Sequence, residues 1–532
     1  MRSLLKPLLL ALLLALTAAP RGCSALNVLL VSTFSSPSHY IWVSALAGGL
    51  LQRGHHVTEL VIRSPATPHP NRTSFVVAEK TYHEKHDFDL EGSFDRTVLE
   101  QIPHMYRCSR ESIRTALRSK AFADLKRHLD VKKLQFDVFV IDYVLQEPLL
   151  GLNSIIGRKP VVVTTAYNLP EDIIQLMGSP YFPSLFPYGG VGADGGMPMT
   201  FQERVFNLYK WIAFKTYIFW VQRPHIEKTI AETFPGSAPL DELLEDVAVS
   251  LVNTSPALHG ALPLVPGIVE VGGLQARPAK PLPTDILDWI DSKNAPHGFV
   301  FMSFGTNVKS SLMSKVRREA ILKAFARIEQ RVLWKYEQDD ILDQLPPNVR
   351  VAKWLPQNDI LAHPNIRCFV SHNGGLSSQE ASYHGVPVLG IPFFVDQLSY
   401  AEKFTKLGLG RRVIFRTITE DIFHEALHDV INNPWYRDNM RRVQQTIRDQ
   451  KETPLERAVW WVEHAARTGG ARHLRSPALR LRWYELWMLD VLAAAAVAAA
   501  LALWALVLSV RVLRGLVGPQ PAGAAKRKTK SH

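Results

Sequence analysis

The sequence predicts an α/β protein built from two doubly wound domains with a cleft between them. Short apolar runs alternate with stretches of helical spacing over residues 26–271, and the same alternation starts again at residue 298. A stretch rich in proline and glycine, 272–297, separates the two series and reads as a linker. Alternating strands and helices favour parallel sheets with helices on both faces, and such sheets bind ligands at the carboxyl ends of their strands.

The N-terminus, residues 1–25, has the composition of a secretory signal peptide. Arg2 and Lys6 precede the apolar run 7–19, and small residues follow at 23–25. A basic start, a short apolar run and a small-residue cleavage site define this class of segment. An uncleaved anchor is the alternative, but the run is short for a bilayer span.

The first half opens with a strand, a helix and a second strand. Leu26–Thr33 is an apolar run, Ser38–Arg53 has helical spacing and stops before a glycine, and His56–Ile62 is apolar again. This order predicts a βαβ unit at the start of a parallel sheet. Two further buried strands are predicted in this half, at 136–142 and 159–165.

The second half, 298–485, repeats the pattern. Strands are predicted at 299–303, 331–336, 349–353, 367–371 and 386–391, and helices at 312–329 and from about residue 375. A long amphipathic helix after Pro454 is expected to close this half.

Residues 488–510 predict one membrane-spanning helix. The run from Val491 to Val510 carries no charge, and its length at ~1.5 Å per residue suits a ~30 Å hydrocarbon layer. The tail, 511–532, is basic without an acidic residue, so the positive-inside rule places it in the cytosol and the preceding chain in the lumen. The final "KTKSH" resembles a dilysine retrieval signal, which predicts a single-pass type I protein of the endoplasmic reticulum membrane.

The net charge of +12 does not predict nucleic-acid binding, because most of it lies in the leader and the tail. Two Asn-x-Ser/Thr sequons, at Asn71 and Asn253, are compatible with a luminal chain. Cys23 leaves with the leader. Cys108 and Cys368 could pair in an oxidising lumen, but two free thiols are the favoured interpretation.

The segment 369–397 carries the main binding motif. The predicted strand 367–371 is followed by His372, and the turn at Gly374 leads into a helix. Glycine admits a ligand close to the backbone, and free N–H groups at a helix N-terminus favour a phosphate, to which His372 can also donate. Ser303 and the amides after it offer similar donors. A plain strand–turn–helix with a capping serine is the alternative.

Polar and aromatic residues around this motif suit the rest of a sugar nucleotide. Trp354 offers a flat face for a base, with core packing as its alternative, and Gln357 offers an amide for the base edge. Glu380, two turns into the helix, can accept hydrogen bonds from a ribose. Asp396 and Gln397 suit the hydroxyls of a sugar.

Together these motifs resemble the donor-binding signature of the UDP-glycosyltransferases, and most of all the membrane-bound animal UDP-glucuronosyltransferase type in its invertebrate members. The match runs from Trp354 to Gln397, and the order of leader, two halves, membrane helix and basic tail extends it over the chain. The resemblance implies a GT-B fold, in which residues 26–271 hold the acceptor and residues 298–485 hold the UDP-sugar.

The resemblance also implies a role for each motif residue. Trp354 stacks on uracil, Gln357 contacts its edge or the ribose, and Glu380 binds the ribose hydroxyls. Ser303, His372 and the amides around Gly374 hold the diphosphate, and Asp396 and Gln397 hold the hexose; Ser377 is a further expected donor-site residue. Two positions depart from the family pattern. Asn373 and Tyr400 stand where many relatives have glycine and asparagine, so the turn is more restricted and one sugar-side or interdomain contact is in doubt.

His39 is the expected catalytic base. It follows the first strand at the start of the first helix, where the helix dipole disfavours the imidazolium. A turn-capping histidine is the alternative, and the family match favours the base. Asp142 ends the strand 136–142 at the same sheet edge and matches the family's orienting aspartate. The implied reaction is an inverting, metal-independent transfer in which His372 and helix amides stabilise the departing UDP.

Other assignments stay open or are set aside. The aromatic and apolar stretch 179–220 is expected to line the acceptor pocket and to touch the membrane, with a core helix as the alternative. The Asp-x-Asp at 87–89 is not expected to bind a metal, and no cofactor besides the donor is expected. The glycosyl group, glucosyl from UDP-glucose or glucuronosyl from UDP-glucuronate, the lipophilic acceptor and a homo-oligomeric state are left undecided.

Three other functions fit the sequence less well. A non-catalytic, membrane-anchored binder of a nucleotide sugar or lipophile is the alternative function, and the presence of His39 and Asp142 argues against it. A nicotinamide-dependent oxidoreductase is disfavoured because no Gly-x-Gly-x-x-Gly follows the first strand. A transporter is excluded by the single mature spanning segment.

Overall fold

The computed structural model describes residues 25–78, 98–132, 134–143, 145–186, 199–394 and 396–518. The chain divides into two compact units, Met1–Arg475 and Ser476–His532. The predicted signal peptide (apart from Ala25), the Asp-x-Asp at 87–89 and the end of the basic tail lie outside the described residues.

The first half is built on a seven-stranded parallel sheet. Its strands follow the order β3-β2-β1-β4-β5-β6-β7. They are β1 (Asn27–Ser32), β2 (His56–Val61), β3 (Arg72–Val76), β4 (Val138–Asp142), β5 (Val161–Thr164), β6 (Val247–Val252) and β7 (Ile268–Glu270). The central strands are buried along their whole length because helices cover both faces of the sheet. This is why continuous apolar runs in the sequence predicted them.

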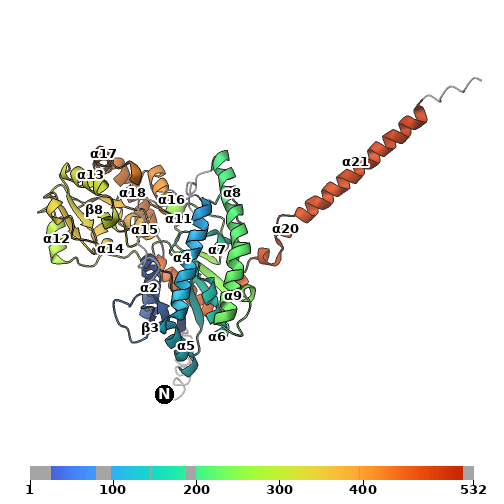
Figure 1. Cartoon of the computed structure of the whole chain (residues 1–532), viewed down its shortest axis with the longest axis horizontal. Coiled ribbons are helices and arrows are strands. Elements are labelled where there is room, and N and C mark those ends of the chain that lie inside the picture. The colour runs from blue at the N-terminus through green and yellow to red at the C-terminus, as the bar shows by residue number, and fades with distance from the viewer. Residues whose placement is uncertain are drawn as a thin grey trace, which may run out of the picture. The chain divides into compact units, whose positions relative to one another are not determined.

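Helices of this half pack on both faces of the sheet (Figure 1). They are α2 (Pro37–Gln52), α4 (Val98–Arg118), α5 (Lys120–Lys132), α6 (Gly151–Ile155), α7 (Glu171–Leu176), α8 (Phe201–Tyr217), α9 (Arg223–Thr233), α10 (Leu240–Leu244) and α11 (Pro256–His259). The aromatic and apolar stretch 179–220 contains α8, which a π-helical turn, η4 (Ile218–Gln222), continues.

The second half contains a six-stranded parallel sheet of order β10-β9-β8-β11-β12-β13. Its strands are β8 (Phe299–Ser303), β9 (Arg331–Lys335), β10 (Val349–Ala352), β11 (Ile366–Ser371), β12 (Val388–Gly390) and β13 (Gly410–Arg412). The predicted α/β class with two parallel sheets is therefore confirmed.

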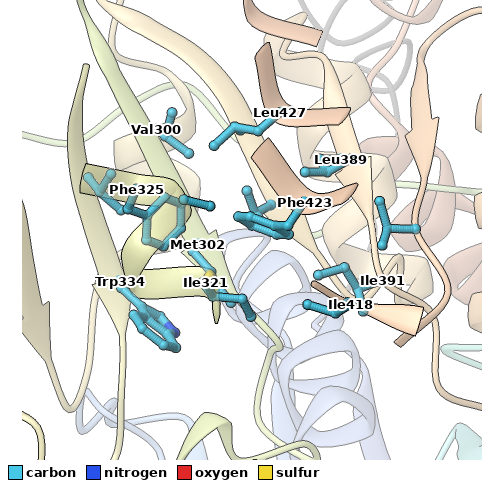
Figure 2. Close-up of a cluster of buried hydrophobic side chains, with 14 of the residues drawn as sticks. Val300, Met302, Ile321, Phe325, Trp334, Leu389, Ile391, Ile418, Phe423 and Leu427 are labelled. Atoms are coloured by element: carbon cyan, nitrogen blue, oxygen red, sulfur yellow. The ribbon is translucent and has the colours of Figure 1, made fainter. Parts of the chain in front are cut away.

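Seven helices of the second half are α12 (Thr284–Ile290), α13 (Lys315–Ala326), α14 (Gln357–Leu361), α15 (Gly375–His384), α16 (Asp396–Lys406), α17 (Glu420–Asn432) and α18 (Pro434–Arg448). Helix α12 lies inside the stretch predicted as a linker. Figure 2 shows one core of this half, where Phe325 of α13 and Phe423 of α17 meet edge to face with ring centroids 5.5 Å apart.

Helix α19 (Pro454–Arg467) returns from the second half to the first. Its buried residues Ala458, Val459 and Val462 belong to the core under β1 and α2, and its Glu463 accepts a 3.0 Å hydrogen bond from His55. This helix follows the second half along the chain and was therefore predicted to belong to it. The apolar stripe of α19 is instead buried against the first sheet, so the chain crosses between the halves twice.

The second compact unit contains α20 (Trp483–Leu486) and α21 (Leu489–Val517). Helix α21 has 29 residues and a mean hydropathy of 2.6, so it is long and apolar enough to cross a membrane. It continues past the predicted end at residue 510 and includes Arg511 and Arg514.

The structure shows the state of one glycosylation sequon and of two cysteines. Asn253 is fully buried, and its side-chain nitrogen donates to Ala166 O at 2.8 Å, so the folded protein has no room for a glycan at this sequon. Cys108 and Cys368 are free thiols, Cys368 buried and Cys108 half-buried.

The contact between α19 and α2 predicts opposite effects for two neighbouring glycines. A Cβ on Gly49 would lie 2.8 Å from Val459 Cγ2, whereas a Cβ on Gly48 meets nothing within 4 Å. Gly48→Ala should raise the free energy of unfolding by up to ~1 kcal/mol through helix propensity. Gly49→Ala should lower it by roughly 1–3 kcal/mol through overpacking. Denaturant titration of the full chain measures both, and a stabilising Gly49→Ala would contradict this packing.

Candidate functional site

A cavity of about 330 Å³ lies between the two halves, at the carboxyl ends of both sets of strands. Its size falls in the range of small-molecule sites. Among the residues that line it are His39 and all the predicted donor-site residues: Ser303, Trp354, Gln357, His372, Gly374, Ser377, Glu380, Asp396 and Gln397. The structure thus brings together residues that are more than 350 positions apart in the sequence.

His39 and Asp142 form a buried pair beside the cavity. His39 stands in the first turn of α2, Asp142 ends β4, and His39 Nδ1 lies 2.8 Å from Asp142 Oδ2. The same oxygen accepts a hydrogen bond from Ser32 Oγ at 3.1 Å. Since a carboxylate only accepts, the contact requires the proton on Nδ1 and leaves the lone pair of a neutral ring on Nε2. Asp142 itself does not line the cavity.

Aromatic rings fix the orientation of the His39 imidazole. The ring centroids of Phe34 and Tyr167 lie 4.4 Å and 4.9 Å from that of His39. Across the cavity, Asn307 Nδ2 of the second half donates to Ser36 Oγ at 2.7 Å. The base-like histidine is therefore held from one side by a carboxylate and from another by packing, next to a direct contact between the halves.

His372 lies between two glycines at the end of β11. A Cβ on Gly374 would be 2.4 Å from His372 Nε2, and a Cβ on Gly305 would be 2.8 Å from its Cε1. Both positions must be glycine for the ring to fit. Burial, helped by the charge of Lys335, lowers the pKa of His372 to about 3, so the ring is neutral in the empty cavity and can donate one N–H.

The N-terminus of α15 faces the same space. Gly374 is its N-cap residue, and Gly375 N donates to Asp396 Oδ2 at 3.1 Å. Burial raises the pKa of Asp396 to about 6 in spite of this hydrogen bond. Gln397 Oε1 accepts from Phe393 N at 2.9 Å, which leaves its NH₂ group for a ligand.

Glu380 forms a network with Gln357 and Ser377. Gln357 Nε2 donates to Glu380 Oε2 at 2.8 Å and to Ser377 Oγ at 3.0 Å. Burial raises the pKa of Glu380 to about 7. Trp354, by contrast, is 71 % exposed in a loop after β10, so core packing is excluded for it and its ring is available to a ligand at the mouth of the cavity.

Several lining residues were missed by the sequence analysis. Arg277 forms a double hydrogen bond with Asp359 at 2.7 and 2.9 Å, and it comes from the stretch interpreted as a linker. Lys335 is the last residue of β9, and its Nζ lies 2.7 Å from Glu337 Oε1. Lys335 could have been predicted, because ligands bind at the carboxyl ends of parallel strands. Nothing in the local sequence indicates that Arg277 lines the cavity.

The two departures from the family pattern have different consequences. Asn373 adopts φ = 57°, the left-handed region that asparagine tolerates best after glycine, so the turn keeps its shape. Tyr400 is buried behind the N-terminus of α15, and its ring meets His259 edge to face at 5.4 Å. It does not line the cavity and contributes packing between the halves.

The cavity combines groups for two kinds of chemistry. His39, held by Asp142, can take a proton, and a helix N-terminus with a neutral histidine can bind an anion. Within the described residues, no three His, Cys, Asp or Glu side chains are grouped so as to hold a metal ion.

Comparison with known sequences finds relatives that match most of the chain. The family model described as "UDP-glucoronosyl and UDP-glucosyl transferase" matches residues 27–515. UDP-glycosyltransferase UGT5 of Dactylopius coccus is 30% identical over 492 residues, with 90% of each chain covered. UDP-glucuronosyltransferase 2B7 of Homo sapiens is 32% identical over 476 residues, which cover 86% of this chain and 87% of the human one.

Solved structures share the fold. A UDP-glucosyltransferase from Polygonum tinctorium, capable of glucosylating indoxyl, is 17% identical with a TM-score of 0.56, covering 84% of this chain and 99% of its own. The glycosyltransferase VinC, in complex with dTDP, is 18% identical with a TM-score of 0.56, covering 83% and 100%. The chain therefore has the GT-B fold.

The raised pKa of Glu380 predicts a pH-dependent stability. The folded protein binds the carboxyl proton of Glu380 more tightly than the unfolded chain does. The protonated group therefore contributes fully to the free energy of unfolding below the ordinary glutamate pKa, and this contribution is lost as pH rises through about 7. From pH 5 to pH 8 the free energy of unfolding of the wild type should fall. In Glu380→Gln this fall should be smaller by roughly 2–4 kcal/mol, because the amide does not titrate. Urea titrations of the ligand-free chain at several pH values measure it. An unchanged pH slope, equal to that of the exposed control Glu245→Gln, would contradict the buried state of Glu380.

Proposed function

The chain belongs to the UDP-glucuronosyl and UDP-glucosyl transferase family, and we propose that its cavity transfers a glucosyl or glucuronosyl group from a UDP-sugar to a hydroxyl of a small lipophilic acceptor, with inversion. Membership makes the chain a UDP-glycosyltransferase. The finer proposal is carried by one observation, the His39–Asp142 pair at the edge of the cavity that the donor-site residues line.

The donor lies along the second half in this proposal. Uracil stacks on the exposed face of Trp354, with Gln357 at its edge, and Glu380 accepts from the ribose hydroxyls. The network that joins Gln357, Ser377 and Glu380 supports this role, because it orients the carboxylate before the ligand binds.

The diphosphate sits at the N-terminus of α15, beside Ser303, His372 and Gly374. The helix dipole and free amides favour its negative charge, and the neutral His372 ring donates an N–H. An anion beside His372 also raises the pKa of this imidazole, so positive charge on the ring is favoured as charge develops on the departing UDP. Asp396 and Gln397 hold the hexose.

The acceptor oxygen gives its proton to His39 Nε2 and attacks the anomeric carbon, while the bond from that carbon to the UDP oxygen breaks on the opposite face. Asp142 keeps the proton on Nδ1 and stabilises the imidazolium that forms. Base and leaving-group stabilisation both come from protein groups, so we propose a transfer that requires no metal.

The proposed setting is the lumen of the endoplasmic reticulum, with the chain as a single-pass type I membrane protein that conjugates lipophilic compounds. Helix α21 and the basic tail support the anchor and its orientation. A non-catalytic binder is the competing function, and the His39 variant below separates the two.

Replacement of the base tests the mechanism. His39→Ala should lower kcat by ~10²–10⁴ with little change in the KM for the UDP-sugar, because the ring acts on the acceptor proton. Asp142→Asn should also lower kcat, because it weakens the hold on the ring. UDP release from a panel of UDP-sugars with a phenol acceptor, run with and without EDTA, provides the readout. The exposed His56→Ala is the control, and turnover of His39→Ala within threefold of wild type refutes the assignment.

Replacement of the stacking residue tests the donor site. Base–aromatic stacking contributes about 1–3 kcal/mol, so Trp354→Ala should raise the Kd for UDP roughly 5- to 150-fold. Calorimetric titration with UDP measures it, with Trp435→Ala, an exposed tryptophan away from the cavity, as the matched control. Equal affinity of the two variants would exclude uracil from the Trp354 face.

A further inference from the structure

Ser32 ends the strand that precedes the proposed base. It is the last residue of β1, it follows a run of apolar residues, and it is 0 % exposed. Its Oγ lies 3.1 Å from Oδ2 of Asp142, which ends the neighbouring strand β4. A carboxylate only accepts, so the Ser32 hydroxyl donates. The partner of this buried serine is therefore the same carboxylate that holds His39.

The strand pairing brings Ser32 and Asp142 together. Strands β1 and β4 are parallel neighbours, and their register pairs Val31 with Ile141. Ser32 and Asp142 are the next residues on these two strands, so they lie side by side at the carboxyl edge of the sheet, where adjacent strands are ~4.8 Å apart. The position of the Ser32 hydroxyl is therefore set by the pairing of two central strands and not by a loop.

The Asp142 carboxylate has few other contacts. Its Oδ2 accepts from both His39 and Ser32, whereas its Oδ1 is buried and has no hydrogen-bond partner within the part of the chain that the structure describes. The torsion that rotates a carboxylate about its Cβ–Cγ bond has a broad, two-fold profile, so a single donor does not fix the plane of the group. A second donor on a different element restricts that rotation, and Ser32 supplies it.

The helix that carries His39 is held by separate contacts. Trp42, three residues further along α2, is fully buried, and its Nε1 donates at 2.7 Å to Oγ1 of Thr164, the last residue of β5. The same helix packs closely against α19 at Gly49. Loss of the Ser32 hydroxyl would leave both contacts in place. Its effect would therefore fall on the carboxylate and not on the position of the helix.

We propose that Ser32 is a positioning residue for the transfer reaction, and that its hydroxyl holds the Asp142 carboxylate in the orientation in which Oδ2 meets Nδ1 of His39. This role rests on the proposed function, because it affects turnover only where His39 takes the proton of the acceptor. As that proton arrives, positive charge develops on the ring beside the carboxylate. A carboxylate already held in place stabilises this charge without reorganisation during the reaction.

Removal of the hydroxyl tests the role in the full chain. Ser32→Ala should lower kcat for UDP release about 3- to 30-fold and leave the KM for the UDP-sugar unchanged, because the lost hydrogen bond acts on the base and lies outside the donor site. Ser250→Ala is the matched control. Ser250 lies in β6 of the same sheet, is 0 % exposed, and its Oγ has no partner among the described residues, so this variant should keep the kcat of wild type.

A conservative variant and a double-mutant cycle separate positioning from folding. Ser32→Thr keeps the hydroxyl, so its kcat should stay above that of Ser32→Ala and its KM should not change. On an Asp142→Asn background, Ser32→Ala should change kcat by less than roughly twofold, because the carboxylate that the hydroxyl orients is no longer there. Thermal midpoints of all variants show whether they are folded. If Ser32→Thr lowers the midpoint, the Ser250 control and the cycle decide.

Equal kcat of Ser32→Ala and Ser250→Ala would overturn the role of Ser32. A full loss of kcat in Ser32→Ala on the Asp142→Asn background would overturn it as well, since the hydroxyl would then act on something other than the carboxylate. A His39→Ala variant with undiminished turnover would refute the proposed function, and the role of Ser32 with it, so the two failures are distinguishable.

Discussion

The site depends on one packing constraint, the return of helix α19 from the second half onto α2 of the first. Gly49 allows Val459 and Leu455 to approach the helix that carries His39, and the buried hydrogen bond between His55 and Glu463 fixes the same contact. The linker crosses in the other direction, and beside its first residue, Gly272, Gln379 Nε2 of α15 donates to Asn253 O of the first half at 3.4 Å. Two crossings of the chain hold the strand ends of both sheets toward one cavity, which neither half could enclose alone.

Within that cavity, burial decides the charge of the functional groups before any ligand is present. Low dielectric surroundings hold His372 neutral and raise the pKa of both Glu380 and Asp396. A ligand that brings its own anions and hydroxyl donors supplies the partners that favour the charged forms, so binding and ionisation are coupled.

His39 has a carboxylate, that of Asp142, as its hydrogen-bond partner. Asp142 belongs to the adjacent strand β4, which pairs with β1 in parallel register, so the carboxylate and the histidine meet at one sheet edge by topology. The proposed base is thus oriented by a central strand that is buried along its whole length.

The sequence by itself determined the fold class, most strands and the residues of the donor motif, because apolar period and strand-end position are local properties. It also located His39 and Asp142, each at the end of a buried run. Only the tertiary structure decided that Arg277 reaches the cavity, that Asn253 is buried, that Tyr400 packs between the halves and that α19 belongs to the core of the first half. These outcomes depend on contacts between segments distant in the chain, and the energy of such contacts leaves no trace in the pattern of either segment taken alone.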